Sequence, residues 1–325
     1  MITNTANKIF KFIKDKKQVP AKDIVQHIGF SKQVVFRHLA RLLDDGRISK
    51  IGKVPKVFYI VKEQEKEEEE YNLNVDTKKI IENNFLTVTS GGEMKKGLDG
   101  FIVWCQKRKQ DVEKSAIQYV SIIKKYNSIR KNGLLDGMKK MRTTFDKVYL
   151  DSLFYIDFYA IEHFGKTKIG QTLLYAKQSQ DRVMIKDLTE DIKPKIKQII
   201  KQYKIDAIGF VPPTVKREVQ LMRELEKNLN FKINKVKITK IKTQVVVPQK
   251  TLNKLEDRIE NAQKTFVVEE QPIYKNILLI DDAVGSGATL NEIAKKIKAK
   301  KIVKNKIIGL VITGSLKDFD VISEV

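Results

Sequence analysis

Two consecutive aspartates, Asp281 and Asp282, stand between an apolar run at residues 277–280 and the small-residue segment 285–289. The apolar run predicts a buried parallel strand, and α/β folds bind ligands at the carboxyl ends of such strands. Small residues let backbone N–H groups surround a phosphate, and the helical pattern that follows would add the positive end of a helix dipole. Ser286 and Thr289 add hydroxyl donors. The segment therefore predicts a phosphate site with two carboxylates beside it.

The same string resembles the motif with which type I phosphoribosyltransferases bind phosphoribosyl pyrophosphate (PRPP). The resemblance implies that Asp281 and Asp282 are the catalytic carboxylates, facing the ribose hydroxyls, and that Mg²⁺ accompanies PRPP. It also implies a cradle for the 5-phosphate formed by Gly285, Ser286, Gly287, Ala288 and Thr289. Gly285 stands where many members carry threonine, so one hydroxyl donor is missing while the backbone cradle stays. No metal site of the protein's own is expected, because one cysteine and three scattered histidines offer no ligand cluster.

The flanking sequence extends the resemblance over residues 150–325. Residues 243–249, together with Leu252, Arg258, Asn261 and Phe266, resemble a run found in ComF-like proteins, the competence-associated branch of the family. A core strand is expected at 205–213, and the turn after it is where the family binds pyrophosphate. The residues implied there are Pro213, Thr214, Lys216 and Arg217. The Arg-Gly-Phe-Asn sequence usual in ComF-like members does not follow, since Glu218 comes directly after Arg217.

Two other interpretations compete with this one. Residues 160–167 fit a relaxed phosphate-loop pattern of nucleoside triphosphatases, but four bulky residues at 161–164 disfavour a loop wrapped around phosphate. A generic strand, loop and helix with surface acids explains neither the paired carboxylates nor the small-residue loop. We therefore expect an α/β phosphoribosyltransferase fold, a parallel sheet flanked by helices, over residues 151–325.

Charge is distributed unevenly along the 325 residues, whose net charge of +23 favours a polyanionic partner. Residues 1–62 hold 14 lysines and arginines against 4 acidic residues, and residues 63–70 then carry six glutamates against one lysine. This change predicts a basic domain at 1–62 and an acidic linker at 63–75. A lysine-rich composition typical of an AT-rich genome is the alternative, although it would not concentrate charge at one end. With one cysteine, no secretion signal and no long apolar run, a cytoplasmic protein without a membrane partner is expected.

The basic segment 1–62 has the pattern of three helices followed by two short strands. Helical periodicity covers 5–16, 21–29 and 31–44, with Pro20 opening the second helix and Ser31 capping the third. The strands flank residues 52–56, as in a β-wing. The segment resembles winged-helix DNA-binding domains, which implies DNA contacts by Ser31, Lys32, Gln33 and Arg37 on the third helix and by Lys53 and Lys56 on the wing. A winged helix used for protein contacts is the alternative, and the basic charge on these elements favours DNA.

Residues 76–150 are expected to be mostly helical and to connect or dimerise the domains. Gly97 and Gly100 predict a turn before residues 101–104. Within 107–130 an apolar seam recurs at alternating four- and three-residue steps, at Val112, Ala116, Tyr119, Ile123 and Tyr126. Such a seam would form a homodimer, which palindromic operators favour, or pack on its own chain.

The order of domains resembles the purine repressors of Gram-positive bacteria, in which PRPP is an effector that is not turned over. The resemblance implies a transcriptional regulator that binds DNA and PRPP. One alternative is an active phosphoribosyltransferase that transfers ribose 5-phosphate from PRPP to a base or amine. Another is a ComF-like accessory protein in DNA uptake or recombination. Sensor and enzyme both use the acidic pair, so Asp281 and Asp282 do not separate them.

Overall fold

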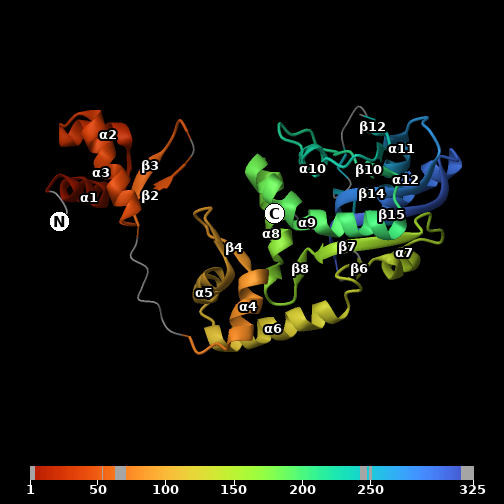
Figure 1. The fold of residues 1–325 in the computed structure, drawn as a ribbon, viewed down its shortest axis with the longest axis horizontal. Coiled ribbons are helices and arrows are strands. Elements are labelled where there is room, and N and C mark those ends of the chain that lie inside the picture. Colours follow the sequence, from red (N-terminus) through yellow and green to blue (C-terminus); the bar gives the residue numbers. More distant parts are fainter. Residues whose placement is uncertain (1–3, 53, 63–70, 242–246, 249–250, 316–325) are drawn as a thin grey trace. The chain divides into compact units, whose positions relative to one another are not determined.

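The computed structural model describes residues 4–52, 54–62, 71–241, 247–248 and 251–315. The chain divides into two compact units, Met1–Tyr71 and Asn72–Val325 (Figure 1). Residues 76–150, expected as a connecting region, belong to the second unit together with the sheet that follows them.

In its described residues, the first unit consists of three helices and an antiparallel sheet of order β1-β3-β2. Its elements are α1 (Asn4–Lys16), β1 (Gln18–Pro20), α2 (Ala21–Ile28), α3 (Lys32–Asp44), β2 (Ile48–Ile51) and β3 (Phe58–Val61). Ser31 caps α3, and its side chain accepts a hydrogen bond from the backbone N–H of Val34. Ile9, Ile24 and Leu39, one from each helix, are buried in a shared core. The helices and strands predicted for this segment are present.

The second unit begins with α4 (Val75–Asn84), the hairpin of β4 (Leu86–Val88) and β5 (Met94–Lys96), α5 (Gly97–Lys107) and α6 (Val112–Ser128). The turn predicted at Gly97 and Gly100 is wrong, because both glycines lie in α5. A Cβ atom on Gly100 would lie 2.4 Å from the carbonyl oxygen of Lys95. The glycine therefore allows the helix to pack closely on β5 and does not mark a break in the helix.

The apolar seam of α6 packs within its own chain. Val112, Ala116, Tyr119 and Tyr126 are all buried. The ring centroid of Tyr119 lies 5.0 Å from that of Phe164, in an aromatic cluster that also includes rings from α5. This surface stabilises the second unit, and no second copy is needed to cover it.

A mostly parallel sheet of order β11-β10-β14-β15-β7-β6 forms the centre of the second unit. The remaining elements are β6 (Leu135–Asp136), α7 (Met138–Thr144), β7 (Ser152–Phe158), β8 (Ala160–Ile161), β9 (Gly165–Lys166), α8 (Lys168–Ser179), α9 (Arg182–Tyr203), β10 (Ala207–Phe210), α10 (Leu221–Leu229), β11 (Asn234–Lys235), β12 (Ile238–Lys240), α11 (Leu255–Thr265), β13 (Phe266–Val268), β14 (Tyr274–Val284), α12 (Ala288–Ala299) and β15 (Val303–Gly314). Only the edge strand β6 runs antiparallel to its neighbour among the described strands of this sheet. The mixed α/β class with a sheet flanked by helices is confirmed.

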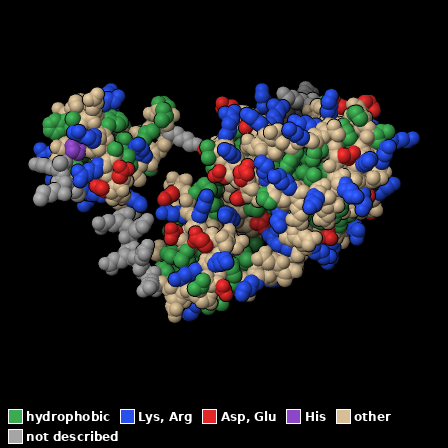
Figure 2. All heavy atoms as spheres, viewed as in Figure 1, with side chains coloured by type: hydrophobic (Ala, Val, Ile, Leu, Met, Phe, Trp, Pro, Cys, Tyr) green, Lys and Arg blue, Asp and Glu red, His purple; other side chains and the backbone are tan. Residues whose placement is uncertain are grey.

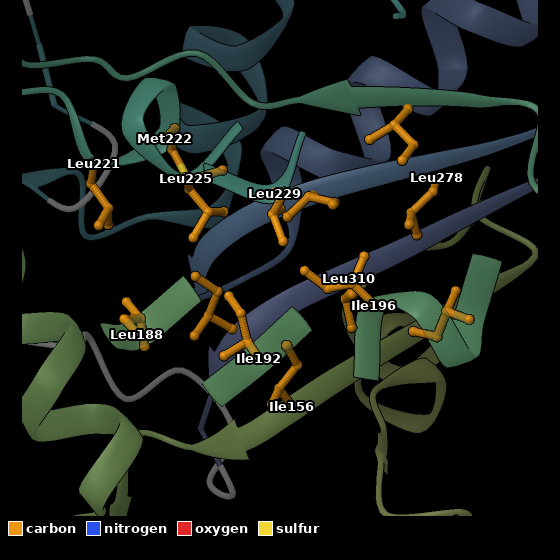
Figure 3. Packing of buried hydrophobic residues seen from close by; sticks show 14 of the residues in the cluster. Ile156, Leu188, Ile192, Ile196, Leu221, Met222, Leu225, Leu229, Leu278 and Leu310 are labelled. Carbon is orange, nitrogen blue, oxygen red and sulfur yellow. The ribbon is translucent and has the colours of Figure 1, made fainter. Parts of the chain in front are cut away.

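Alternation along the strands sends successive side chains to opposite faces of the sheet. Leu278 and Leu310 point to the face covered by α8, α9 and α10, where they pack with Ile192, Ile196 and Leu225 (Figure 3). The other face is covered by α12, which contacts β15 and is buried along its apolar side. This two-sided burial explains why the strand at 277–280 is a continuous apolar run without alternation.

Lysine and arginine side chains are spread over the face of the second unit that Figure 2 shows, with acidic side chains between them. No helix in the described part of the chain has the length and apolar character that crossing a membrane requires.

Candidate functional site

The carboxyl ends of β10 and β14 border a cavity of about 220 Å³. The two strands are parallel neighbours, with Phe210 opposite Ile280, so the segments that follow them leave the sheet at the same edge. The predicted site residues that line this cavity are Pro213, Thr214, Arg217, Asp281, Asp282, Gly285, Ser286, Gly287, Ala288 and Thr289. Lys216 is exposed and does not line the cavity. The structure thus joins two predicted sets of residues that lie about 70 positions apart in the sequence.

The loop that follows β14 has the geometry of an anion cradle. Gly287 is the N-cap residue of α12 with a φ of 87°, a left-handed conformation that favours glycine. The buried Ser286 accepts a hydrogen bond through its Oγ from the backbone N–H of Ala288 at 3.3 Å. The amino-terminal end of α12 faces the cavity, and Thr289 lies in its first turn. Backbone N–H groups and the helix dipole together favour a bound phosphate here.

Arg258 lies beside Gly285, the position at which the loop differs from the phosphoribosyltransferase motif that it resembles. It lies on α11 with only 5% of its surface exposed, and its Nε donates to the carbonyl oxygen of Leu252 at 2.7 Å. A Cβ atom on Gly285 would be 3.1 Å from its Nη1. The guanidinium therefore borders the space that a threonine side chain would fill, and it places a charged donor where the hydroxyl is missing.

The two aspartates have different surroundings although they are adjacent. Asp281 accepts a hydrogen bond from the backbone N–H of Asp282 at 2.8 Å. Burial, together with the neighbouring charge of Asp282, raises the pKa of Asp281 to about 8. Asp282 instead forms an ion pair with Lys177, at 2.7 Å between Nζ and Oδ2. Strand alternation separates the pair, so that Asp282 points toward α8.

Two lysines were missed in the sequence: Lys177 lines the cavity, and Lys240 contacts residues that line it. Lys177 lies near the end of α8, 105 residues before Asp282, and nothing in a helical pattern distinguishes it from other lysines. Lys240 ends β12, where its Nζ donates to Thr214 Oγ1 at 2.8 Å and lies 4.3 Å from the ring centroid of Phe266. Burial lowers the pKa of Lys240 to about 8, although the nearby Asp281 opposes the shift. In the sequence, only its place at the end of a short strand distinguishes Lys240 from other lysines.

In the first unit the described residues predicted to contact DNA are exposed. Lys32, Gln33 and Arg37 are exposed on α3, Ser31 caps it, and Lys56 is exposed between β2 and β3. Lys53 lies outside the described residues. Sequence reasoning missed Phe36, whose side chain is 39% exposed on the same helix, with Lys32 Nζ 5.7 Å from its ring centroid.

The competing phosphate-loop pattern folds differently from what its interpretation requires. Residues 160–166 form the hairpin of β8 and β9, and the ring of Phe164 stacks on Trp104 with 5.1 Å between centroids. Thr167 caps α8 through its own side chain, which accepts from the backbone N–H of Gly170 at 3.0 Å. These contacts build a structural hairpin in which Ile161 and Phe164 are buried while Glu162 and His163 are exposed.

The described residues contain no group of three or more His, Cys, Asp or Glu side chains that could hold a metal ion. Comparison with known proteins gives no further assignment: no family model matches the chain, and no curated protein matches it.

Proposed function

We propose that the protein is a transcriptional regulator that binds PRPP, or a closely related phosphoribosyl ligand, in the second unit and DNA through the first. The supporting observation is that the predicted phosphate loop, the aspartate pair and the predicted pyrophosphate turn line one cavity. The loop and the aspartate pair are consecutive, and the pyrophosphate turn, about 70 positions earlier, is a separate segment that lies at the same edge of the sheet.

The cavity offers a distinct set of groups for each part of PRPP. The cradle at residues 285–289, supported by Arg258, would bind the 5-phosphate. The carboxylates of Asp281 and Asp282 are acceptors for the ribose hydroxyls, and Thr214 and Arg217 border the side where the diphosphate would lie. The aspartate pair and ligand diphosphate oxygens are the hard oxygen donors that Mg²⁺ prefers, so the residues fit an ion carried in with the ligand. When bound, such an ion neutralises diphosphate charge.

The first unit supports the DNA-binding half of the proposal. Its exposed basic and polar residues on α3 form a surface suited to phosphates and base edges, and the exposed ring of Phe36 is suited to thymine methyl groups. Regulation requires that PRPP bind with different affinity to the DNA-bound and free protein. A homodimer, which palindromic operators favour, forms part of this proposal.

The proposal is tested by incubating the protein with fragmented genomic DNA, with and without PRPP and Mg²⁺, and sequencing the retained fragments. We expect a few discrete fragments whose retention changes with PRPP. The matched control lacks residues 1–71 and should lose the fragments while still binding PRPP. Uniform retention that ignores PRPP, or specific retention by the truncated protein, contradicts the proposal.

An active phosphoribosyltransferase is the second candidate function, because the two carboxylates that line the cavity would serve an enzyme as well as a sensor. It predicts release of pyrophosphate from PRPP with a base or amine acceptor, and loss of that release in Asp282→Asn. PRPP binding without pyrophosphate release across a broad panel of acceptors supports the regulator instead.

A further inference from the structure

Lys177 connects α8 to the carboxylate pair of the cavity. Its ammonium lies 2.7 Å from Asp282 Oδ2, and both side chains are largely buried, with 27% and 18% of their surfaces exposed. A lysine in this position neutralises a carboxylate that the ribose hydroxyls of PRPP would otherwise use as an acceptor. One of the two carboxylates of the site is therefore held in an internal ion pair.

The backbone around Lys177 is fixed to the predicted pyrophosphate turn. The guanidinium of Arg217 donates to the carbonyl oxygen of Lys177. Three residues further on, Gln180 accepts a hydrogen bond from the backbone N–H of Val219 at 3.0 Å. Both hydrogen bonds fix the backbone near Lys177 to the predicted pyrophosphate turn, and Lys177, Asp282 and Arg217 line the same cavity.

We infer that Lys177 is a specificity-determining residue, an inference that rests on the proposed function. When the ligand binds, the ammonium of Lys177 leaves Asp282 and pairs with the diphosphate. A diphosphate carries more negative charge than a carboxylate, and a charge-assisted hydrogen bond to it compensates for the broken ion pair. Asp282 then becomes free to accept from the ribose hydroxyls. Ribose 5-phosphate has no diphosphate, so it must break the same ion pair without compensation. Lys177 thereby makes the site select diphosphate-bearing ligands over their monophosphate counterparts.

The test is calorimetric titration of the full chain with PRPP and, separately, with ribose 5-phosphate. In Lys177→Met we expect PRPP to bind about tenfold or more weakly, while ribose 5-phosphate binds as well as before or better. Lys177→Arg should restore most of the preference for PRPP. The matched control is Lys186→Met, an exposed lysine on α9, which should leave both affinities unchanged.

The outcomes separate this inference from the proposal on which it rests. If the unsubstituted chain does not bind PRPP, the proposed function and the role of Lys177 both fail. If it binds PRPP but Lys177→Met weakens both ligands equally, the lysine is merely structural. Unchanged affinities for both ligands also overturn the inference. Thermal unfolding of Lys177→Met identifies a folding defect, and Lys177→Arg, which keeps the charge, then decides the question.

Discussion

Asp281 and Asp282 are adjacent on one strand, but different neighbouring groups give their carboxyl groups different electrostatic surroundings. Asp282 meets the ammonium of Lys177, whereas Asp281 meets buried surface and the charge of Asp282 itself. The half-buried Lys240 on the other side lies near Asp281, and burial disfavours its charged form. Asp281 in the cavity and Lys240 beside it therefore ionise close to neutral pH, so experiments at different pH values test each group.

Asp281→Asn should stabilise the empty protein at alkaline pH. The folded pKa of about 8 exceeds the unfolded value near 3.8, so the folded protein binds one more proton in that window and loses stability as pH rises through it. Asparagine keeps an acceptor for the backbone N–H of Asp282 and removes the titration. We expect almost no gain in the free energy of unfolding at pH 4, a gain that grows as pH rises from 4 to 8, and a constant gain of roughly 5 kcal/mol above pH 8.

Urea denaturation across this pH range measures the difference. Asp257→Asn, at an exposed position of α11, is the control and should follow the unsubstituted protein at every pH. If the free energy of unfolding of Asp281→Asn changes with pH in the same way as that of the unsubstituted protein, the carboxyl group of Asp281 is not held in its protonated form.

Lys240→Met should weaken PRPP binding at neutral pH and reduce the fall in affinity at alkaline pH, leaving the part that comes from Asp281, whose pKa is also about 8. The Lys240 ammonium donates to Thr214, which lines the cavity, and its pKa of about 8 means that the charge is lost as pH rises from 7 to 9. PRPP affinity of the unsubstituted protein should fall by about tenfold over that range, the effect of one charge-assisted hydrogen bond. Calorimetry at pH 7 and 9 checks this, with Lys237→Met as an exposed control. Equal pH dependence in Lys240→Met and the unsubstituted protein would exclude the lysine as its source.

At the scale of elements, two nearby glycines in the turn into α12 have different roles: Gly287 is needed for stability, and Gly285 for ligand binding. Gly287→Ala forces a side chain onto a φ of 87° and places a Cβ atom 2.4 Å from the sulfur of Met141. We expect a loss of about 1–3 kcal/mol in the free energy of unfolding, measured by urea denaturation. Gly285→Ala meets only the guanidinium of Arg258, at 3.1 Å, and should keep near-normal stability while weakening phosphate binding. Equal stability of the two variants would contradict this division.

Elements whose signals are local were predictable from the sequence, and contacts between distant elements were not. The apolar run of β14, the aspartates and the small loop are consecutive, and α3 shows its cap at Ser31. The prediction at Gly100 was wrong because glycine is favoured both in turns and in a helix that packs closely on a strand. Lys177 and Lys240 come close to the cavity only because α8 and β12 pack near it. This packing between distant elements leaves no local pattern in the sequence.

At the scale of the whole molecule, the boundary between the units falls after Tyr71, and the sheet depends on residues that precede position 151. The edge strand β6 pairs with β7, and Arg130 donates to the carbonyl oxygen of Ile156 at 2.7 Å and forms an ion pair with Asp157. The backbone N–H of Tyr149 donates to the side chain of Asn291 on α12 at 2.8 Å. These contacts make residues 72–150 part of the domain that carries the cavity.

A fragment of residues 72–325 should therefore fold and bind PRPP like the full chain, whereas a fragment of residues 151–325 should not. The shorter fragment leaves β7 without β6, exposes the aromatic face of Phe164, and buries Asp157 without Arg130. Removing one partner of a buried ion pair alone costs about 3–5 kcal/mol, a large share of a domain's stability. Circular dichroism during heating, followed by PRPP titration, compares the two fragments. A shorter fragment that melts at the same temperature as the longer one would place the boundary at position 151 instead.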